Sequence, residues 1–263
     1  MILGKSLTKK YENVFALDSV DFTILDNKLT YLVGPNGSGK TTLIKCLLGL
    51  VKSSDGEIKI NQEIINGNYN YRDTIGYMPQ VASFPENLTV LEVINMIKEI
   101  RNHTKDYDEE LIEKFNLHRE FKKIIKNLSG GTKQKLNAAI AFLFNPSILI
   151  LDEPSAGLDP ISSSQLKDKI IREREKGKTV LLTSHIINEL EELAEEIIFL
   201  YEGKVLFLGE KNELIEKTME RNLERAISKL MASKYENFIE IFIPVFPRNG
   251  FRSVCAGKCS SGD

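Results

Sequence analysis

The stretch TYLVGPNGSGKTTLIKCLLGL, residues 30–50, joins an apolar run, a glycine-rich loop and a segment of helical pattern. Residues 30–33 have the character of a strand, and residues 34–41 match the pattern G-x-x-x-x-G-K-[ST]. The apolar residues of the helical segment fall on one face: Leu43, Ile44, Leu47 and Leu48. Glycines let successive backbone N–H groups surround a phosphate, and a helix N-terminus adds partial positive charge. The stretch therefore predicts a strand–loop–helix unit that holds nucleotide phosphates.

The end of this loop supplies the cation and the hydroxyl that such a site needs. Lys40 is expected to reach the β- and γ-phosphates, and the Thr41 hydroxyl is expected to bind Mg²⁺. The alternative is a chance glycine-rich turn before a helix, and the flanking strand and helix patterns argue against it. The predicted nucleotide-binding residues are Gly34, Pro35, Asn36, Gly37, Ser38, Gly39, Lys40, Thr41 and Thr42.

Outside this stretch, the chain alternates between strand-length apolar runs and helical segments. SILILDEP at 147–154 and TVLLTSH at 179–185 are near-continuous apolar runs, as in parallel strands covered on both faces. The alternation predicts an α/β protein with a mostly parallel sheet and right-handed crossovers. Residues 81–145 have a helical pattern without a convincing strand, and Thr89 with Glu92 forms a capping-box pattern there. We interpret 81–145 as a helical subdomain inserted between two core strands.

Two later segments carry clear local signals. Asp159 and Pro160 suit the N-cap and first position of a helix that ends before Gly177. Residues 197–209 have the pattern of a β-hairpin. Both elements fit the predicted α/β core.

Length and composition are those of an ordinary globular domain. The chain has 263 residues, 42% hydrophobic and 27% charged, with a formal net charge of -2, and it lacks the basic excess expected of a nucleic-acid-binding protein. It has no run of about 18 apolar residues, the length that a transmembrane helix needs. Its first ten residues lack the apolar core of a signal peptide. We therefore expect a cytoplasmic protein without a nucleic-acid partner.

An acidic pair, Asp152 and Glu153, closes the apolar run at 147–154. Carboxylates at the C-terminal end of a parallel strand face the ligand crevice of such sheets. Asp152 is expected to hold Mg²⁺, and Glu153 to act as the base that polarises the attacking water. A solvated acidic turn is the alternative, and the phosphate loop upstream argues against it.

The motif LSGGT at 128–132 makes a family resemblance specific. The phosphate loop, LSGG, the acidic strand end, SAGLD and TSH occur in the order and spacing of the ATP-binding cassette (ABC) family, and the resemblance covers roughly residues 1–215. It implies a P-loop NTPase core with a mostly parallel sheet, an N-terminal antiparallel β region and an inserted helical subdomain. We expect an ATPase domain at 1–230 and a tail at 231–263.

The resemblance also implies roles for single residues. Tyr11 matches the aromatic residue that stacks on adenine, with a surface tyrosine as the alternative. Gln80 matches the glutamine that contacts Mg²⁺ and the attacking water, and His185 matches a histidine that contacts the γ-phosphate. Asp159 lies in the loop that couples the two sites of a dimer. Residues of the signature contact ATP bound to the opposite subunit: Ser129, Gly130 and Gly131.

The implied assembly pairs two ATPase subunits with integral membrane permease subunits. The chain carries one set of motifs, so we expect it to dimerise with a second copy or a homologue when it binds MgATP. Its place would be peripheral, on the inner face of the cell membrane. The segment 81–88 would receive the permease, with Phe84 either docking there or packing into the helical subdomain.

One departure from the family pattern lies in the signature, where Thr132 stands in the usual place of glutamine and Gln134 follows two residues later. The phosphate-facing residues remain, so hydrolysis is expected to survive. In the tail, Cys255 and Cys259 invite a metal-site reading, but a single cysteine pair without a third ligand argues against it.

A narrower resemblance is to cassettes that pair with ABC-2-type permeases, in particular the Nos-type subunits of nitrous-oxide reductase copper-site maturation. It is carried by GYMPQVASFPENLTV at 76–90 and by GKVLF at 203–207. One alternative is an ABC ATPase that acts on a ribosome or DNA, although the chain lacks a second cassette and a long coiled coil. Another is a non-hydrolysing ATP-gated module, and the presence of Glu153 and His185 argues against it.

Overall fold

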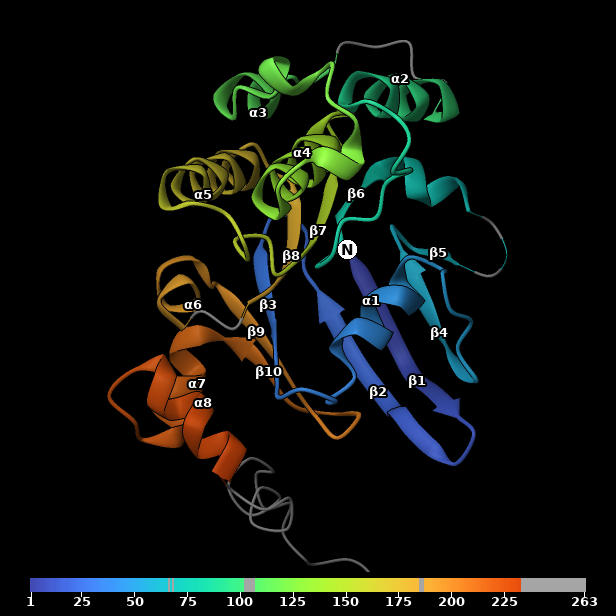
Figure 1. The fold of residues 1–263 in the computed structure, drawn as a ribbon. Helices are drawn as coiled ribbons and strands as arrows, with labels where there is room; N and C mark the ends of the chain where they lie inside the picture. Colours follow the sequence, from blue (N-terminus) through green and yellow to red (C-terminus); the bar gives the residue numbers. More distant parts are fainter. Residues whose placement is uncertain (66, 68, 102–106, 185–186, 233–263) are drawn as a thin grey trace, which may run out of the picture.

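The computed structural model describes residues 1–65, 67, 69–101, 107–184 and 187–232, which form two β-sheets with helices around them (Figure 1). The larger sheet has the strand order β10-β9-β3-β8-β7-β6. Its strands, in that order, are Lys204–Glu210, Glu196–Tyr201, Leu29–Val33, Thr179–Thr183, Ile148–Asp152 and Ile75–Met78. The smaller sheet has the order β2-β1-β4-β5. Its strands are Val14–Ile24, Ile2–Tyr11, Asp55–Ile60 and Glu63–Ile64.

Strand pairing confirms the predicted fold class. In the larger sheet β3 runs parallel to β8 and β9, β7 runs parallel to β6 and β8, and β10 pairs antiparallel with β9. The smaller sheet is antiparallel throughout. Every residue of β3, β7 and β8 is buried, which explains their continuous apolar sequences, because helices or the second sheet cover both faces.

The larger sheet separates two hydrophobic cores. Successive side chains of a strand point to opposite faces, so Leu32 joins one core while Tyr31 and Val33 join the other. The first core also contains Leu43 and Ile44 of helix α1 (Lys40–Leu47) and residues of the smaller sheet. Helix α1 is thus held between the sheets, with the glycine-rich loop at its N-terminus (Figure 1).

The second core contains the remaining helices of the domain (Figure 1). These are α2 (Val90–Arg101), α3 (Glu110–Lys114), α4 (Gly130–Phe142), α5 (Pro160–Glu175), α6 (Ile187–Leu193), α7 (Lys211–Thr218) and α8 (Leu223–Ala232). Helices α2, α3 and α4 follow β6 and precede β7 in the chain, as the predicted helical insertion requires. Helix α4 packs closely on β6, since a Cβ at Gly76 would lie 2.1 Å from the Ala141 carbonyl oxygen.

The local signals read from the sequence are confirmed. Asp159 is the N-cap of α5 and accepts a hydrogen bond from the Ser162 N–H at 2.9 Å. At the start of α2, the Thr89 N–H donates to the Glu92 carboxylate at 2.7 Å, which completes the capping box. The segment at 197–209 forms the β9–β10 hairpin.

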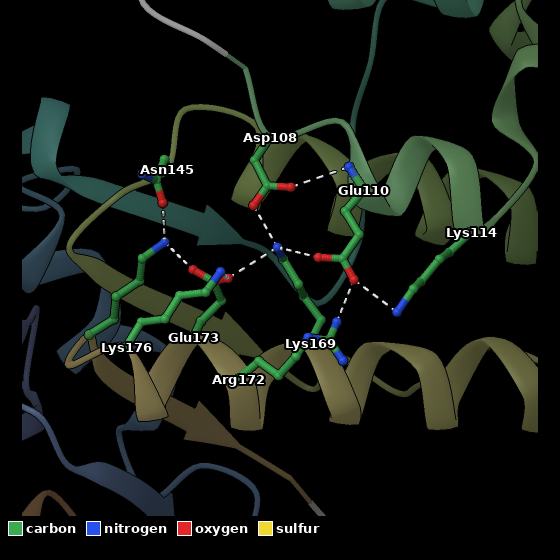
Figure 2. A network of polar contacts seen from close by, with 9 residues as sticks. Asp108, Glu110, Lys114, Asn145, Lys169, Arg172, Glu173 and Lys176 are labelled. Carbon is green, nitrogen blue, oxygen red and sulfur yellow. Dashed lines mark hydrogen bonds and ion pairs between the residues drawn. The ribbon is translucent and has the colours of Figure 1, made fainter.

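A buried ionic network joins the helical insertion to the sheet-covering helix α5 (Figure 2). Its centre is Lys169, whose side chain is 1% exposed. The Lys169 ammonium lies 2.5 Å from Asp108, 2.8 Å from Glu110 and 3.1 Å from Glu173. Asp108 and Glu110 lie at the start of α3, whereas Lys169 and Glu173 lie on α5, so the network connects two elements that are far apart in sequence.

The network continues from Glu173, which is fully buried, to the beginning of β8. Glu173 pairs with Lys176 at 2.8 Å and with Lys178, and the Lys178 ammonium donates to the Asn145 side chain at 2.6 Å. Burial raises the pKa of Glu173, but hydrogen bonds from its three lysine partners outweigh it and lower the pKa to about 2. The carboxylate is therefore held in its charged form.

The described part of the chain ends in α8, which buries Leu223, Ala226, Ile227 and Leu230. The tail with Cys255 and Cys259 lies outside the described residues. None of the helices in the described ranges combines the length and the hydrophobicity that a membrane-spanning helix requires.

Candidate nucleotide-binding and hydrolysis site

The glycine-rich loop turns tightly between β3 and α1, and its backbone leaves no space for side chains at two positions. Gly39 has a φ of +108°, and a Cβ there would lie 2.3 Å from the Ala16 carbonyl oxygen. A Cβ at Gly34 would lie 2.0 Å from the Leu200 carbonyl oxygen. The loop therefore packs against β2 and β9, which fixes its shape before any ligand binds.

Lys40, the first residue of α1, bends back over this loop. Its ammonium donates to the carbonyl oxygens of Gly34 at 2.7 Å and Pro35 at 3.0 Å. Burial lowers the pKa of Lys40, while the nearby carboxylates of Glu153 and Asp152 act in the opposite direction. The Lys40 ammonium group therefore lies over the glycine-rich turn, against two of its carbonyl oxygens.

A cavity of about 160 Å³ opens beside Lys40, and the residues that line it are all among the site residues that the sequence predicts. The lining residues are Asn36, Gly37, Ser38, Gly39, Lys40, Thr41, Thr42, Gln80, Asp152 and Glu153. They come from three separate parts of the chain: the phosphate loop with α1, the end of β6, and the end of β7. A larger cavity of about 550 Å³ lies beside β4, and none of the predicted site residues lines it.

The cavity's donors suit an anion. Ser38 is 2% exposed, yet its hydroxyl oxygen has no hydrogen-bond partner among the residues that the structure describes. An unsatisfied buried hydroxyl is costly, and a phosphate oxygen would relieve it. With the Lys40 ammonium and the α1 N-terminus, this hydroxyl gives a positively polarised surface at one end of the cavity.

The other end of the cavity is acidic, and a neighbouring strand orders it. Asp152 ends β7 and is 5% exposed, and it accepts a hydrogen bond from the Thr183 hydroxyl on β8. The Glu153 N–H donates to the Thr183 carbonyl at 3.1 Å and to its hydroxyl at 3.0 Å. Glu153 has a φ of +50°, a conformation that non-glycine residues rarely adopt and that often marks functional sites.

Thr183 is a site residue that sequence reasoning missed. The sequence feature that could have identified Thr183 is in the TSH segment, where this threonine ends an otherwise apolar strand. Asp152 and Thr183 are directly paired in the β7–β8 register, and that pairing is a property of the sheet rather than of either strand.

The side chains at the acidic end fit a magnesium ion. Thr41, Gln80 and Asp152 offer a hydroxyl, an amide oxygen and a carboxylate to one cavity, and oxygen atoms are the ligands that Mg²⁺ prefers. The described residues contain no cluster of three or more His, Cys, Asp or Glu that suits a metal held by protein alone. Mg²⁺ usually binds through one or two carboxylates and substrate phosphates.

The signature residues lie apart from this cavity. Ser129 is the N-cap of α4, with Gly130 and Gly131 in its first turn, and none of the three lines the cavity. Asp159 does not line it either; its carboxylate pairs with Lys135 of α4 at 2.7 Å. A Cβ at Gly131 would lie 3.1 Å from the Gly157 carbonyl oxygen. The LSGGT and SAGLD loops are therefore packed together, away from the phosphate loop of the same chain.

The structure does not test the predicted nucleotide contacts of Tyr11 and His185. Tyr11 ends β1, is 45% exposed and lies under the Lys9 ammonium, which is 4.9 Å from the ring centroid. It does not line the cavity. His185 lies outside the described residues.

Comparisons with known proteins identify the family of this chain. The family model described as "ABC transporter" matches residues 17–156. The ATP-binding protein LptB of the lipopolysaccharide export system of Haemophilus influenzae is 34% identical over 82% of this chain and 92% of its own. The bacitracin transport ATP-binding protein BcrA of Bacillus licheniformis is 36% identical over 78% of this chain and 68% of its own.

Solved structures of ATP-binding cassettes also superpose on this chain. The ATP-binding subunit of an ABC transporter superposes with a TM-score of 0.82 at 26% identity, covering 88% of this chain and 99% of its own. A dimeric ATP-binding cassette in a post-hydrolysis state, bound to ADP and Pi, superposes with a TM-score of 0.72 at 27% identity, covering 80% and 98%. The chain belongs to the ABC transporter family, as an ATP-binding cassette ATPase.

Proposed function

We propose that this chain binds MgATP between the phosphate loop and the acidic end of β7, and that its hydrolysis drives transport through a separate membrane permease. The observation that carries the proposal is the cavity shared by Lys40, Gln80, Asp152 and Glu153. The proposed phosphate-binding cation, Lys40, and the proposed base, Glu153, line the same cavity, which supports the proposal.

The proposed chemistry follows from the positions of these groups. Backbone N–H groups of the loop, the Ser38 hydroxyl and Lys40 hold the phosphates and offset their charge. Thr41, Gln80 and Asp152 would hold Mg²⁺, which would neutralise the negative charge of the phosphates while the terminal phosphoryl group passes from ADP, the leaving group, to water. The Glu153 carboxylate then accepts a proton from the attacking water, while its backbone stays anchored to Thr183.

The proposed working unit is a pair of subunits. Ser129, Gly130 and Gly131 point to a second half-site, because they lie off the cavity of their own chain. In the proposed dimer they contact the terminal phosphate of ATP on the partner, and Tyr11 and His185 complete the contacts to adenine and the γ-phosphate. The dimeric cassette bound to ADP and Pi supports such a pairing.

The proposed contact with the permease lies after Gln80. Phe84 is half-buried and packs against the second hydrophobic core, which favours packing over docking for this ring. Val81 is 77% exposed and offers a free apolar side chain beside the nucleotide site. We therefore assign permease docking to Val81 and the adjoining loop, at the inner face of the membrane.

The proposed kind of transporter rests on the names of the similar proteins. Those found include proteins named for lipopolysaccharide export, bacitracin transport and lantibiotic transport, which suits an exporter. None of these names supports the Nos-type subgroup. The proposed extent of the cassette is 1–230, with 231–263 as a separate tail.

Co-purification from detergent-solubilised membranes tests the transporter assignment. The tagged protein should co-purify with an integral membrane protein. Val81→Asp should weaken this co-purification without changing the melting temperature of the chain. Ile100→Asp is the matched control, because Ile100 is 75% exposed on α2 of the same insertion. Recovery of ribosomal proteins or DNA in place of a membrane protein would favour the alternative of an ABC ATPase without a permease.

A further inference from the structure

The first turn of α4 contains a pair of hydroxyls that the family pattern does not explain. The Ser129 oxygen caps the helix by accepting the Thr132 N–H at 3.1 Å. The Thr132 hydroxyl lies 2.8 Å from the same oxygen. Two hydrogen bonds therefore join the N-cap to one residue, Thr132.

Helix α2 of this chain has the usual capping-box arrangement at its N-terminus. In α2, Glu92 lies three residues after the N-cap, and its carboxylate accepts both the backbone N–H of Thr89 at 2.7 Å and its hydroxyl at 2.8 Å. In a capping box the long side chain reaches back to the N-cap backbone, as Glu or Gln can. Threonine is too short for that, so Thr132 bonds the Ser129 hydroxyl instead.

The N-cap hydroxyls of α2 and α4 use their protons differently. A serine hydroxyl has one proton to donate and two positions at which to accept. In α2 the N-cap proton is used internally, because the Glu92 carboxylate can only accept. In α4 the Thr132 N–H fills one acceptor position on Ser129, and a proton from the Thr132 hydroxyl can fill the other. The Ser129 proton is then free to point away from the helix.

We propose that Thr132 is a positioning residue that donates to Ser129, so that Ser129 donates its own proton to the terminal phosphate of ATP held by a second copy of this chain. The inference rests on the proposed two-subunit function. Linked hydrogen bonds polarise one another, so the chain from Thr132 through Ser129 gives the phosphate a stronger donor than an isolated serine.

Contacts with the SAGLD loop also hold the first turn of α4 in a fixed orientation. The Lys135 ammonium, one turn further along α4, pairs with Asp159 at 2.7 Å, and Gly131 faces the carbonyl of Gly157. The SAGLD loop thus fixes the direction in which the α4 N-terminus points. Ser129 itself is exposed, as a donor to another subunit must be.

The test uses the full chain in a Glu153→Gln background, where bound ATP is not turned over. Dimerisation with MgATP is measured by analytical ultracentrifugation. Thr132→Val keeps the shape and the capping N–H but removes the hydroxyl, and we expect it to raise the dimer dissociation constant about tenfold. Thr132→Ser keeps the hydroxyl and should restore the parental value to within about twofold. Thr89→Val removes a hydroxyl from the start of α2 and should leave dimerisation unchanged.

Each outcome is decisive. Parental dimerisation by Thr132→Val overturns the inference, and so does an equal loss in Thr132→Ser, because that would show a role for the threonine methyl group. A parent that stays monomeric with MgATP, whatever stands at 132, means that the proposed function itself fails and the inference with it.

Discussion

The Thr183 hydroxyl on β8 donates to Asp152 at the end of the neighbouring strand β7. The same oxygen accepts the Glu153 N–H at 3.0 Å. One side chain thus orients the carboxylate assigned to Mg²⁺ and the backbone of the residue assigned as base.

Thr183→Val should lower ATP hydrolysis about 10- to 100-fold, the usual cost of losing a group that orients a metal ligand. The valine keeps the strand packed but cannot hold Asp152. Steady-state phosphate release measures the loss, and a higher Mg²⁺ requirement should accompany it. Thr183→Ser retains the hydroxyl and should stay close to wild type; equal loss in both variants would argue that strand packing is responsible.

Lys40→Ala should weaken MgATP binding about 10- to 100-fold, because the phosphates lose a charged hydrogen-bond donor. Isothermal calorimetry gives the affinity directly. Lys45→Ala, on the exposed side of the same helix, is the control and should bind like wild type. Unchanged affinity in the Lys40 variant would remove the phosphate-loop assignment.

Lys169→Met should destabilise the protein by about 3–5 kcal/mol, since it leaves the buried Glu173 carboxylate without its central partner. Lys167→Met on the same helix breaks only the ion pair with Glu192, in which both side chains are partly exposed, and should cost less than about 1 kcal/mol. Urea unfolding of both variants makes the comparison. Similar values for the two would mean that the network adds little.

Acid should weaken the same network. Burial raises the pKa of Glu110, but hydrogen bonds from Lys114 and Lys169 outweigh it and lower the pKa to about 2, and Glu173 has a similar value. Because these folded-state values lie below the ordinary value of 4.5, the stability they contribute is complete above that pH and is lost as the pH falls toward about 2. Unfolding free energies measured across this window should fall more steeply for wild type than for Lys169→Met; parallel slopes would contradict the assignment.

The sequence was sufficient to predict the fold class and all ten cavity residues, because each lies in a short motif whose chemistry is local. Asp159 as N-cap and the Thr89–Glu92 capping box were predictable for the same reason. The Thr183–Asp152 contact was not, since it depends on strand register.

The Lys169 network could not be predicted from the sequence either, because in the sequence Asp108, Glu110 and Lys169 look like ordinary exposed charged residues. Strand β6 has four residues, too few for a clear period. Its place in the sheet follows from pairing with β7 and from the close approach of α4 at Gly76.

The most direct test of the account is size-exclusion chromatography of Glu153→Gln with MgATP. The amide keeps the shape of the side chain but cannot take a proton from water, so ATP should stay bound between two copies. The variant should elute at twice the mass of the 29.8 kDa chain, whereas the wild type should hydrolyse its ATP and elute mainly as a monomer. A variant that stays monomeric and releases phosphate at the wild-type rate would contradict it.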